Sequence, residues 1–431
     1  MPLNFINRCA MVHGMTPNSP QVKTTDGLPL GTTYWKLWMS SALSNLADGV
    51  FKIALPLMAI QLTQSPTLIA GLTVAATLPW LFFALTAGAL ADRVDRRKLM
   101  LWANLSRAVL PALLITVILL DLGSIWALYV VALTVGVAET LYDTSAQSIL
   151  PQIVHKGQLS RANGRLYAAE LTANQFIGPP LGGLLVGIGA VAGFAVPAAL
   201  WLAAVGGLLL LPGSFRIERE QKTTLRFDIR EGLRYLWNQK ILRTLAAMTG
   251  VVNFASSAAF AVLVLFAVGP TSEMGLSEVG FGILLTTSAV GAFIGSFISD
   301  SVEAKLGRSK SLALCILGCA LFVGAPALTN NPYILGPILL VGGILVVLWN
   351  VITVSLRQRI APNRLLGRVN SAYRLLAWGT MPLGAAAGGV LSQWLGLEAM
   401  FGIMGVLTLA LLVLMPVLTD KAITAAEVDH V

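Results

Sequence analysis

Charged side chains are scarce in this chain. Only 11% of its 431 residues are Asp, Glu, Lys or Arg, whereas 56% are hydrophobic and the mean hydropathy is +0.77. Soluble globular proteins contain about 25% charged residues, so the composition excludes an ordinary water-soluble enzyme. Apolar stretches of at least about eighteen residues, long enough to cross a bilayer as helices, recur along the sequence. We therefore expect an all-α polytopic membrane protein.

Cysteine and histidine are also rare. Three cysteines do not make a disulfide framework, and Cys315 and Cys319, four residues apart in one apolar stretch, are expected to be packing residues rather than a bridge or a metal site. The sequence has no G-x-x-x-x-G-K-[ST] loop, catalytic triad or metal-ligand cluster. We therefore predict no enzyme activity, no cofactor and no metal. The three histidines, His13, His155 and His430, lie outside the apolar stretches.

The hydrophobic pattern predicts twelve membrane spans in which basic residues alternate between sides. Connections after odd-numbered spans contain no Lys or Arg, whereas those after even-numbered spans are basic, so both termini are expected on the cytoplasmic side of a bacterial inner membrane. This topology accounts for most of the net charge of +9 and argues against a nucleic-acid partner. The first 33 residues lack an apolar segment before a cleavage site, so we expect no signal peptide. The spans are 36–62, 68–91, 99–120, 125–149, 166–188, 191–212, 242–268, 276–299, 310–328, 332–356, 369–393 and 397–418.

An internal repeat divides the chain into two halves. "DRVDRRK" (92–98) is similar to "DSVEAKL" (300–306) at an offset of 208, and "RAN" (161–163) to "RVN" (368–370) at 207, which carries Gly182 onto Gly389. The predicted organisation is a cytoplasmic tail (1–33), a six-helix bundle (34–212), a linker (213–241), a second six-helix bundle (242–418) and a second tail (419–431). In the linker, Leu225, Ile229, Leu233 and Leu236 share one helical face, which predicts either an amphipathic helix on the anionic leaflet or a simple connection.

Two six-span halves in a parallel repeat describe the major facilitator architecture, with a substrate site between them near the bilayer midplane. "GALADRVDRRK" (88–98) resembles the loop between spans 2 and 3 that is characteristic of that superfamily. The matching residues are Gly88, Leu90, Asp92, Arg93, Arg96 and Arg97. Asp95 departs from the usual glycine, as in the drug:proton antiporter branch that includes macrolide-efflux and siderophore-export proteins. "SNLADG" (44–49) and residues 356–389 also resemble that branch.

The resemblance implies that this loop gates the transporter. Asp92 is expected to face a helix N-terminus of the opposite half, and Arg96 and Arg97 to bridge to Asp143. We assign Gly88, Arg93, Glu170 and Asp300 to the same gate. The alternative is a basic loop that only fixes topology.

A run of glycines and prolines, "NQFIGPPLGGLL" (174–185), resembles the antiporter motif of exporters in the superfamily. Gly178 and Gly182 lie one helical turn apart and allow close packing, with Pro179 and Gly183 beside them. The resemblance implies that this helix prevents proton leak. Gly384 and Gly388 in "MPLGAAAGG" are its expected counterpart.

Ionisable residues within the spans each require an explanation, because a charge at the bilayer centre costs about 3 kcal/mol or more. We predict that Asp48 and Glu139 exchange protons, with Arg107 and Lys52 as their switching counter-charges. The alternative is a pair of permanent ion pairs, Asp48 with Lys52 or Glu139 with Arg107, that only hold helices together. An entering proton releases about 2.3 kcal/mol per 100 mV, so transport needs no nucleotide hydrolysis.

The predicted function is a proton-coupled exporter of a small amphipathic molecule, acting as a monomer in the lipid bilayer. Acids and aromatics in a cavity suit cationic, apolar drugs such as antibiotics. The alternative is a siderophore or another native metabolite, and a non-transporting receptor or scaffold is a third possibility. The candidate substrate-binding residues are Trp80, Phe254, Phe260, Trp349, Asn350 and Trp378.

Overall fold

The computed structural model describes residues 29–91, 94–120, 122–155, 158–215, 225–269, 272–362 and 365–428. Within these residues the chain is helical, and the only β pairing is one isolated bridge between Val268 and Leu276. Eleven helices of this described part are long and apolar enough to cross a membrane. The remaining predicted span lies in residues 159–188, where two α-helices flank a π-helical segment. The predicted all-α fold with its apolar spans is confirmed.

The described part of the first half contains seven α-helices. They are α1 (Thr32–Leu62), α2 (Pro66–Ala91), α3 (Arg96–Leu119), α4 (Ile125–Ile149), α5 (Leu159–Glu170), α6 (Gly178–Ile188) and α7 (Ala190–Leu209), with the π-helix η4 (Leu171–Ile177) between α5 and α6. A short 3₁₀ turn, η2 (Leu150–Gln152), follows α4. The second half contains α9 (Lys240–Ala267), α10 (Glu278–Leu306), α11 (Arg308–Gly324), α12 (Pro332–Ile360), α13 (Leu366–Leu395) and α14 (Leu397–Leu409), with 3₁₀ turns η5 (Ala325–Ala327) and η6 (Ala410–Val417).

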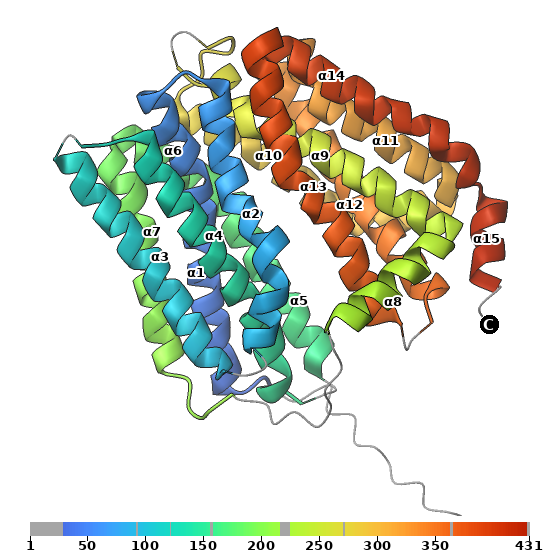
Figure 1. The fold of residues 1–431 in the computed structure, drawn as a ribbon, viewed down its shortest axis with the longest axis horizontal. Helices are drawn as coiled ribbons and strands as arrows, with labels where there is room; N and C mark the ends of the chain where they lie inside the picture. Colours follow the sequence, from blue (N-terminus) through green and yellow to red (C-terminus); the bar gives the residue numbers. More distant parts are fainter. Residues whose placement is uncertain are drawn as a thin grey trace, which may run out of the picture.

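The connections between helices lie at two opposite ends of the molecule, which differ in their content of Lys and Arg. The basic end holds the start of α1 and the connections α2–α3, α4–α5, α10–α11 and α12–α13. The Lys and Arg residues assigned to the even connections lie in these connections or in the helix ends beside them. The opposite end holds the connections α1–α2, α3–α4, α6–α7, α9–α10, α11–α12 and α13–α14, which contain no Lys or Arg. The two groups of helices lie side by side and diverge towards the basic end (Figure 1).

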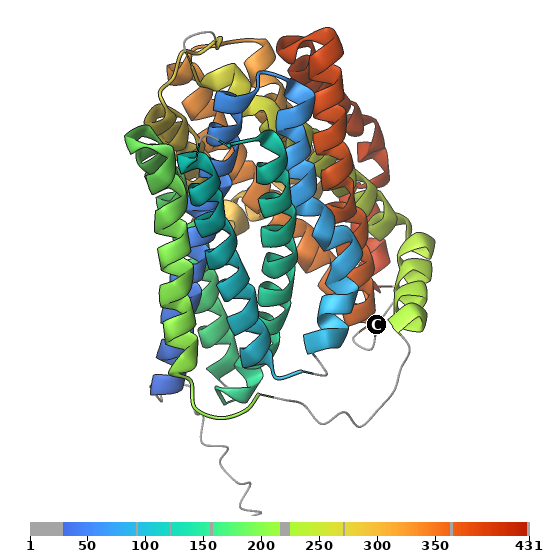
Figure 2. The same cartoon turned by 60° about the vertical axis from the view of Figure 1, so that its left-hand side comes forward.

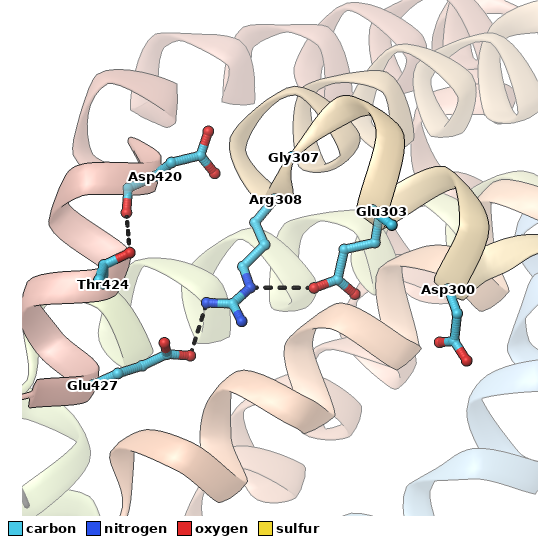
Figure 3. Close-up of a pocket in the computed structure, with 8 residues that line it drawn as sticks. Asp300, Glu303, Gly307, Arg308, Asp420, Thr424 and Glu427 are labelled. Atoms are coloured by element: carbon cyan, nitrogen blue, oxygen red, sulfur yellow. Dashed lines mark hydrogen bonds and ion pairs between the residues drawn. The ribbon is translucent and has the colours of Figure 1, made fainter.

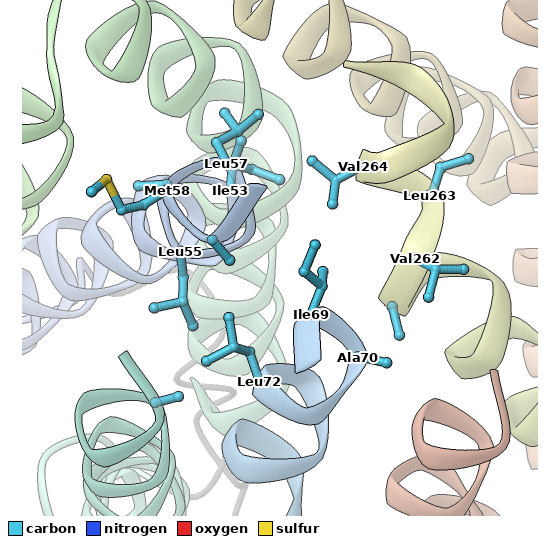
Figure 4. Packing of buried hydrophobic residues seen from close by; sticks show 14 of the residues in the cluster. Ile53, Leu55, Leu57, Met58, Ile69, Ala70, Leu72, Val262, Leu263 and Val264 are labelled. Carbon is cyan, nitrogen blue, oxygen red and sulfur yellow. The ribbon is translucent and has the colours of Figure 1, made fainter. Parts of the chain in front are cut away.

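The hydrophobic core shows how the halves are joined. One large cluster of buried side chains spans both halves near the opposite end, and Figure 4 shows Ile53 and Leu57 of α1 and Ile69 of α2 close to Val262 and Val264 of α9. At the basic end the cores are separate. One contains only first-half residues such as Tyr34 and Tyr142, and the other contains second-half residues such as Trp349 and Tyr373. Among the described residues, the halves therefore share a core at the opposite end only.

Two further helices cover the basic end of the second half. Helix α8 (Leu225–Asn238) packs on α13 through Gly232, whose absent side chain leaves room for the Arg368 carbonyl, and Leu236 is completely buried. The apolar face of the linker therefore packs at least partly on protein rather than only on the leaflet. The C-terminal stretch forms α15 (Asp420–Val428), and Ile423 is buried in the same core. Figure 2 shows α8 at the edge of the molecule, beside the second half.

Candidate functional site

A fully buried ion pair lies inside the first half, at the middle of α1. Arg107 Nη1 of α3 is 3.2 Å from Asp48 Oδ1 and 3.3 Å from Asp48 Oδ2. Arg107 is 0% exposed and Asp48 is 5% exposed. An ion pair removed from water to this degree keeps its charges only when further hydrogen bonds compensate the lost hydration.

Polar side chains on three helices supply part of that compensation. Trp201 Nε1 of α7 donates to Asp48 Oδ1 at 3.1 Å, and Arg107 Nη1 donates to Ser44 Oγ at 3.3 Å. Ser44 in turn donates to Asn104 Oδ1 at 3.1 Å. The guanidinium also lies 5.1 Å from the ring centroid of Tyr142. Its Nε and Nη2 atoms are buried without a hydrogen-bond partner in the described structure, so the network leaves the cation incompletely bonded.

A second ion pair lies one turn along the same face of α1. Lys52 Nζ is 3.1 Å from Glu139 Oε1 of α4. The Lys52 side chain is 49% exposed and the Glu139 side chain 18%. An ionised lysine at this depth does not face acyl chains without a large cost, so we infer that its exposed surface faces water between the two halves.

The observed pairing differs from the two permanent ion pairs that the sequence left as the alternative. Asp48 pairs with Arg107 instead of Lys52, and Glu139 pairs with Lys52 instead of Arg107. Residues four apart share a helix face, but Asp48 and Lys52 each reach a different neighbouring helix. Each pair therefore ties α1 to another helix, α3 in one case and α4 in the other.

Asp143, which the sequence assigns to the gate, lies near these charges. It is within electrostatic range of Lys52, Glu139 and Arg107. The predicted bridge from Arg97 to Asp143 is wrong, because Arg97 Nε and Nη2 donate to the carbonyls of Leu208 and Leu209 at 2.8 and 2.7 Å. Arg96 Nη1 donates to the Ser148 carbonyl at the end of α4. Glu170, the last residue of α5, is also within electrostatic range of Lys52.

The connection between α2 and α3 is held by Asp95, the residue that departs from the superfamily pattern. Asp95 is the N-cap of α3 and accepts hydrogen bonds from the backbone N–H groups of Arg97 and Lys98. Its other oxygen accepts from Ser214 Oγ at 2.7 Å and from Phe215 N at 3.1 Å. Burial alone raises the pKa of Asp95, but these hydrogen bonds outweigh it and hold the pKa below its ordinary value. Gly88 lies near the end of α2, and Asp92 and Arg93 lie outside the described residues.

Asp300, the counterpart of Asp92, borders a pocket at the basic end of the second half (Figure 3). The pocket has a volume of about 570 Å³ and lies between the α10–α11 connection and α15. Arg308 joins its two walls, with Nε 3.1 Å from Glu303 and Nη1 2.8 Å from Glu427. Asp420 accepts from the backbone N–H of Ser309 at 3.0 Å. The pocket is therefore part of the attachment of α15.

The glycine run packs as its spacing predicts. A Cβ on Gly178 would lie 2.6 Å from Gly49 Cα, and one on Gly182 would lie 2.9 Å from the Val50 carbonyl, both on α1. Gly183 faces the other half, where a Cβ would overlap the Glu278 carbonyl. The Pro179 carbonyl lies against Gly282 of α10. The contacts with α1 lie near mid-helix, beside Asp48, whereas those with Glu278 and Gly282 lie at the start of α10, towards the opposite end.

The second half repeats this packing with an offset of 206. Gly384 and Gly388 lie against Phe254 and Ala258 of α9, within the half, and Gly389 lies against Pro66 and Ala70 of α2, across the halves. The pairs with the same role are therefore Gly178 with Gly384, Gly182 with Gly388, and Gly183 with Gly389. The sequence offset of 207, set before residue 171, places Gly182 on Gly389 and is wrong by one beyond that point.

The π-helix explains the change of offset. A π-helical segment accommodates one extra residue in an otherwise α-helical stretch. Residues 171–177 are π-helical in the first half, whereas α13 is α-helical from 366 to 395. One additional residue in the first half turns an offset of 207 into 206, as observed. The first half thus carries an inserted residue between the "RAN" motif and the glycine run.

Comparisons with known proteins agree with this geometry. The family model described as "transmembrane secretion effector" matches residues 28–429. The chain belongs to this family, within the major facilitator superfamily. It is 27% identical over 341 residues to an enterobactin exporter, EntS, of Shigella boydii, covering 78% of this chain and 80% of the relative. It is also 27% identical over 370 residues to the multidrug efflux pump Tap of Mycolicibacterium fortuitum, covering 82% and 88%.

Solved structures show the same fold. A point mutant of the nucleoside transporter NupG superposes with a TM-score of 0.73 at 12% identity, covering 91% of this chain and 99% of that one. A bacterial homologue of the iron transporter ferroportin superposes with a TM-score of 0.67 at 16% identity, covering 92% and 98%. The predicted major facilitator fold is confirmed.

The aromatic candidates of this transporter occupy different environments. Trp80 of α2 and Trp378 of α13 lie edge to face across the halves, with centroids 5.6 Å apart. Trp349 is buried, and its Nε1 donates to Thr249 Oγ1 at 3.1 Å. Phe260 pairs with Phe322 of α11 within the second half. Phe254 is half-buried against α13, and Asn350 is exposed. The structure therefore brings together Trp80 and Trp378 but not all six candidates.

Sequence reasoning missed two arginines of this transporter. Arg357 lies 3.8 Å above the Tyr373 ring, and Arg374 lies 5.3 Å from the Trp378 ring. From the sequence, Arg357 counts only as a topological charge of a basic connection, although α12 continues to Ile360. Arg374 falls inside the predicted span 369–393, and that position is itself the signal for a functional residue.

Proposed function

We propose that this protein is a proton-coupled exporter of small amphipathic molecules that works by alternating access. The observation that carries the proposal is the pair of ion pairs at mid-membrane, one buried and one exposed, which tie α1 to α3 and α4. Ion pairs that only held helices together would not require one pair to be buried and the other to be partly exposed to water. The relatives named as an enterobactin exporter and a multidrug efflux pump support export as the direction.

The arrangement of the halves supports a state that is open at the basic end. The shared core and the close glycine contacts between the halves lie at the opposite end, while the cores at the basic end are separate. With the basic end in the cytoplasm, as the positive-inside rule predicts, this state faces inward. It is the state in which an exporter takes up its substrate.

Proton exchange then follows from the different burial of the two carboxylates. In this state both acids are paired with cations, as expected for ionised, proton-free carboxylates. Opening at the opposite end would admit water and protons from outside. Protonation of Glu139 would release Lys52, and protonation of Asp48 would release Arg107. Return to the inward state would restore both pairs and discharge the protons.

The test uses purified protein in liposomes that contain a pH-sensitive dye. We expect substrate addition to drive proton movement in the wild type, and Asp48→Asn and Glu139→Gln to abolish it. Glu398→Gln is the control, because Glu398 is an exposed acid at the opposite end. If either variant folds normally and still moves protons at the wild-type rate, the coupling assignment is wrong. A drug-susceptibility panel in an efflux-deficient host identifies the substrate class independently.

A further inference from the structure

Two arginines on the second half have no acidic partner. Of the described residues, none supplies a carboxylate that forms an ion pair with Arg357 or Arg374. Neighbouring arginines at the same end are paired, Arg359 with Glu427 at 3.7 Å and Arg368 with Glu231. In the first half, Lys52 and Arg107 are also paired. Among the described residues, Arg357 and Arg374 are therefore two cations on the neighbouring helices α12 and α13 without a carboxylate partner.

Each of these arginines lies over an aromatic ring. The guanidinium carbon of Arg357 is 3.8 Å from the Tyr373 centroid, and that of Arg374 is 5.3 Å from the Trp378 centroid. A ring on the face of a guanidinium holds the group in place and leaves its N–H donors, which lie in its plane, free for a carboxylate or phosphate. Arg357 Nε is buried without a hydrogen-bond partner in the part of the chain that the structure describes.

Helix geometry directs these side chains away from lipid. Leu376 and Leu383, seven residues apart, are exposed apolar side chains on one face of α13. Arg374 precedes Leu376 by two residues, which is about 200° around the helix. It therefore points away from that face and lies one turn from Trp378, which meets Trp80 of the other half. On α12, the exposed Asn350 precedes Arg357 by seven residues and shares its face.

The two like charges are close enough to interact unfavourably. Arg374 is within electrostatic range of Arg357, and repulsion between cations is larger where water is partly excluded. An anionic group between them would remove this repulsion and form charge-assisted hydrogen bonds with both. Trp378 and Trp80 lie beside this position and offer rings for an aromatic group.

We propose that Arg357 and Arg374, with Trp378 and Trp80, form a binding site for the anionic group of an aromatic organic anion. This inference rests on the proposed export function and narrows its substrate from amphipathic molecules in general to aromatic anions. The acids of the first half carry protons, and the arginines of the second half hold the substrate.

The experiment compares two dyes with the same xanthene ring system and opposite charge. Fluorescein is the anionic probe and rhodamine 6G the cationic one, and binding to the purified protein is measured by fluorescence anisotropy in neutral detergent. We expect Arg374→Gln and Arg357→Gln each to weaken fluorescein binding by about tenfold or more, and rhodamine binding to remain unchanged or to strengthen. Arg374→Lys, which keeps the charge but not the planar fork, should give an intermediate loss.

Arg359→Gln is the matched control, because Arg359 lies two residues from Arg357 but pairs with Glu427. Thermal unfolding of each variant identifies any loss of fold. The proposal is overturned if fluorescein binds the Gln variants as well as the wild type, or if both dyes lose affinity equally in folded variants. It is also overturned if phosphatidylglycerol in nanodiscs binds in an arginine-dependent manner and fluorescein does not, because the anion would then be a lipid headgroup. Binding needs no proton gradient, so these outcomes are independent of the proton-coupling test.

Discussion

The two halves of the molecule share a helical plan but differ in the chemistry at mid-membrane. In the first half, the side chains that join α1, α3 and α7 are charged, with Asp48 and Arg107 at the centre. In the second half, hydrogen bonds between neutral side chains join α9 to α12 and α13, the counterparts of α1, α4 and the α5–α6 stretch. Thr249 Oγ1 accepts from Trp349 Nε1 and is 2.6 Å from the Tyr373 hydroxyl, and Asn253 donates to the Ala377 carbonyl.

This difference separates two tasks that an exporter must perform. A group that carries protons must change its charge, whereas a group that binds an anion must keep it. Carboxylates with cationic partners satisfy the first requirement, and arginines over aromatic rings satisfy the second because arginine stays protonated. Under the two proposals, the halves share a mechanical plan, and the side chains at their centres give each half a different role.

The largest effect is expected from neutralising the buried acid. Asp48→Asn leaves Arg107 buried without its counter-charge, and breaking a buried ion pair typically lowers the free energy of unfolding by about 3–5 kcal/mol. Thr249→Val removes a neutral partner in the second half and should cost about 1–3 kcal/mol. Thermal or denaturant unfolding in detergent measures both.

The same two variants also separate coupling from stability. Substrate-driven proton movement should be lost in Asp48→Asn and kept in Thr249→Val. Equal losses of stability, or loss of coupling in Thr249→Val alone, would show that the charged and neutral networks do not differ in role.

The sequence predicts the span limits well because hydrophobicity alone determines them. The predicted span 125–149 coincides with α4, and 397–418 covers α14 and the 3₁₀ turn that follows it. The identity of the buried charges was also predictable, since any ionisable residue within a span is exceptional. Their partners were not, because periodicity places Asp48 and Lys52 on one face of α1 but does not tell which helix each reaches.

The next largest effect is expected from a substitution at the contact between the halves, where Gly183 of α6 lies against Glu278 of α10. Gly183→Ala would drive a Cβ into the Glu278 carbonyl, and relieving such a clash typically costs about 1–3 kcal/mol. The cost applies only when the opposite end is closed, so the population should shift towards the state open at that end. Labelling of a cysteine introduced at the opposite end measures this shift.

Gly187→Ala is the matched control, because its Cβ would meet only Val279 Cγ2 at 3.8 Å. It should leave the labelling rate unchanged. If Gly183→Ala also leaves it unchanged, the inter-half contact does not close the opposite end.

The inserted residue of the π-helix lay beyond sequence reasoning, whereas Arg374 was overlooked although its position inside a predicted span was a signal. One extra residue changes the composition and length of an apolar helix too little to be recognised from sequence. The insertion is detected only when the packing partners of the two halves are compared. Arg374 follows Arg368 closely and is easily taken for part of the same boundary. Its role depends on the Trp378 ring and on the absence of a nearby acid among the described residues. Both are features of the tertiary structure and not of the local sequence.

A smaller effect is expected at the α2–α3 connection of the first half. Asp95→Asn weakens the N-cap of α3 and the bonds from Ser214 and Phe215, which should lower the free energy of unfolding by about 1 kcal/mol. Because the folded-state pKa of Asp95 lies below its unfolded value, this contribution is present above the unfolded pKa and is lost as pH falls through the folded pKa. The difference between variant and wild type should therefore shrink in acid. A difference that is independent of pH would show that the carboxylate charge is not involved.

The smallest effect is expected at the corresponding loop of the second half. Glu303, which aligns with Asp95, caps no helix and instead pairs with Arg308, and both side chains are 21% exposed. Partly exposed pairs contribute about 0–1 kcal/mol and weaken as salt screens the charges. Glu303→Gln should therefore change unfolding by less than Asp95→Asn, and high salt should remove the difference, whereas salt should affect the hydrogen-bonded cap of Asp95 less. Unfolding of both variants at low and high ionic strength measures this contrast. A larger, salt-independent loss in Glu303→Gln would mean that the attachment of α15, and not the cap, is the stronger support of the two loops.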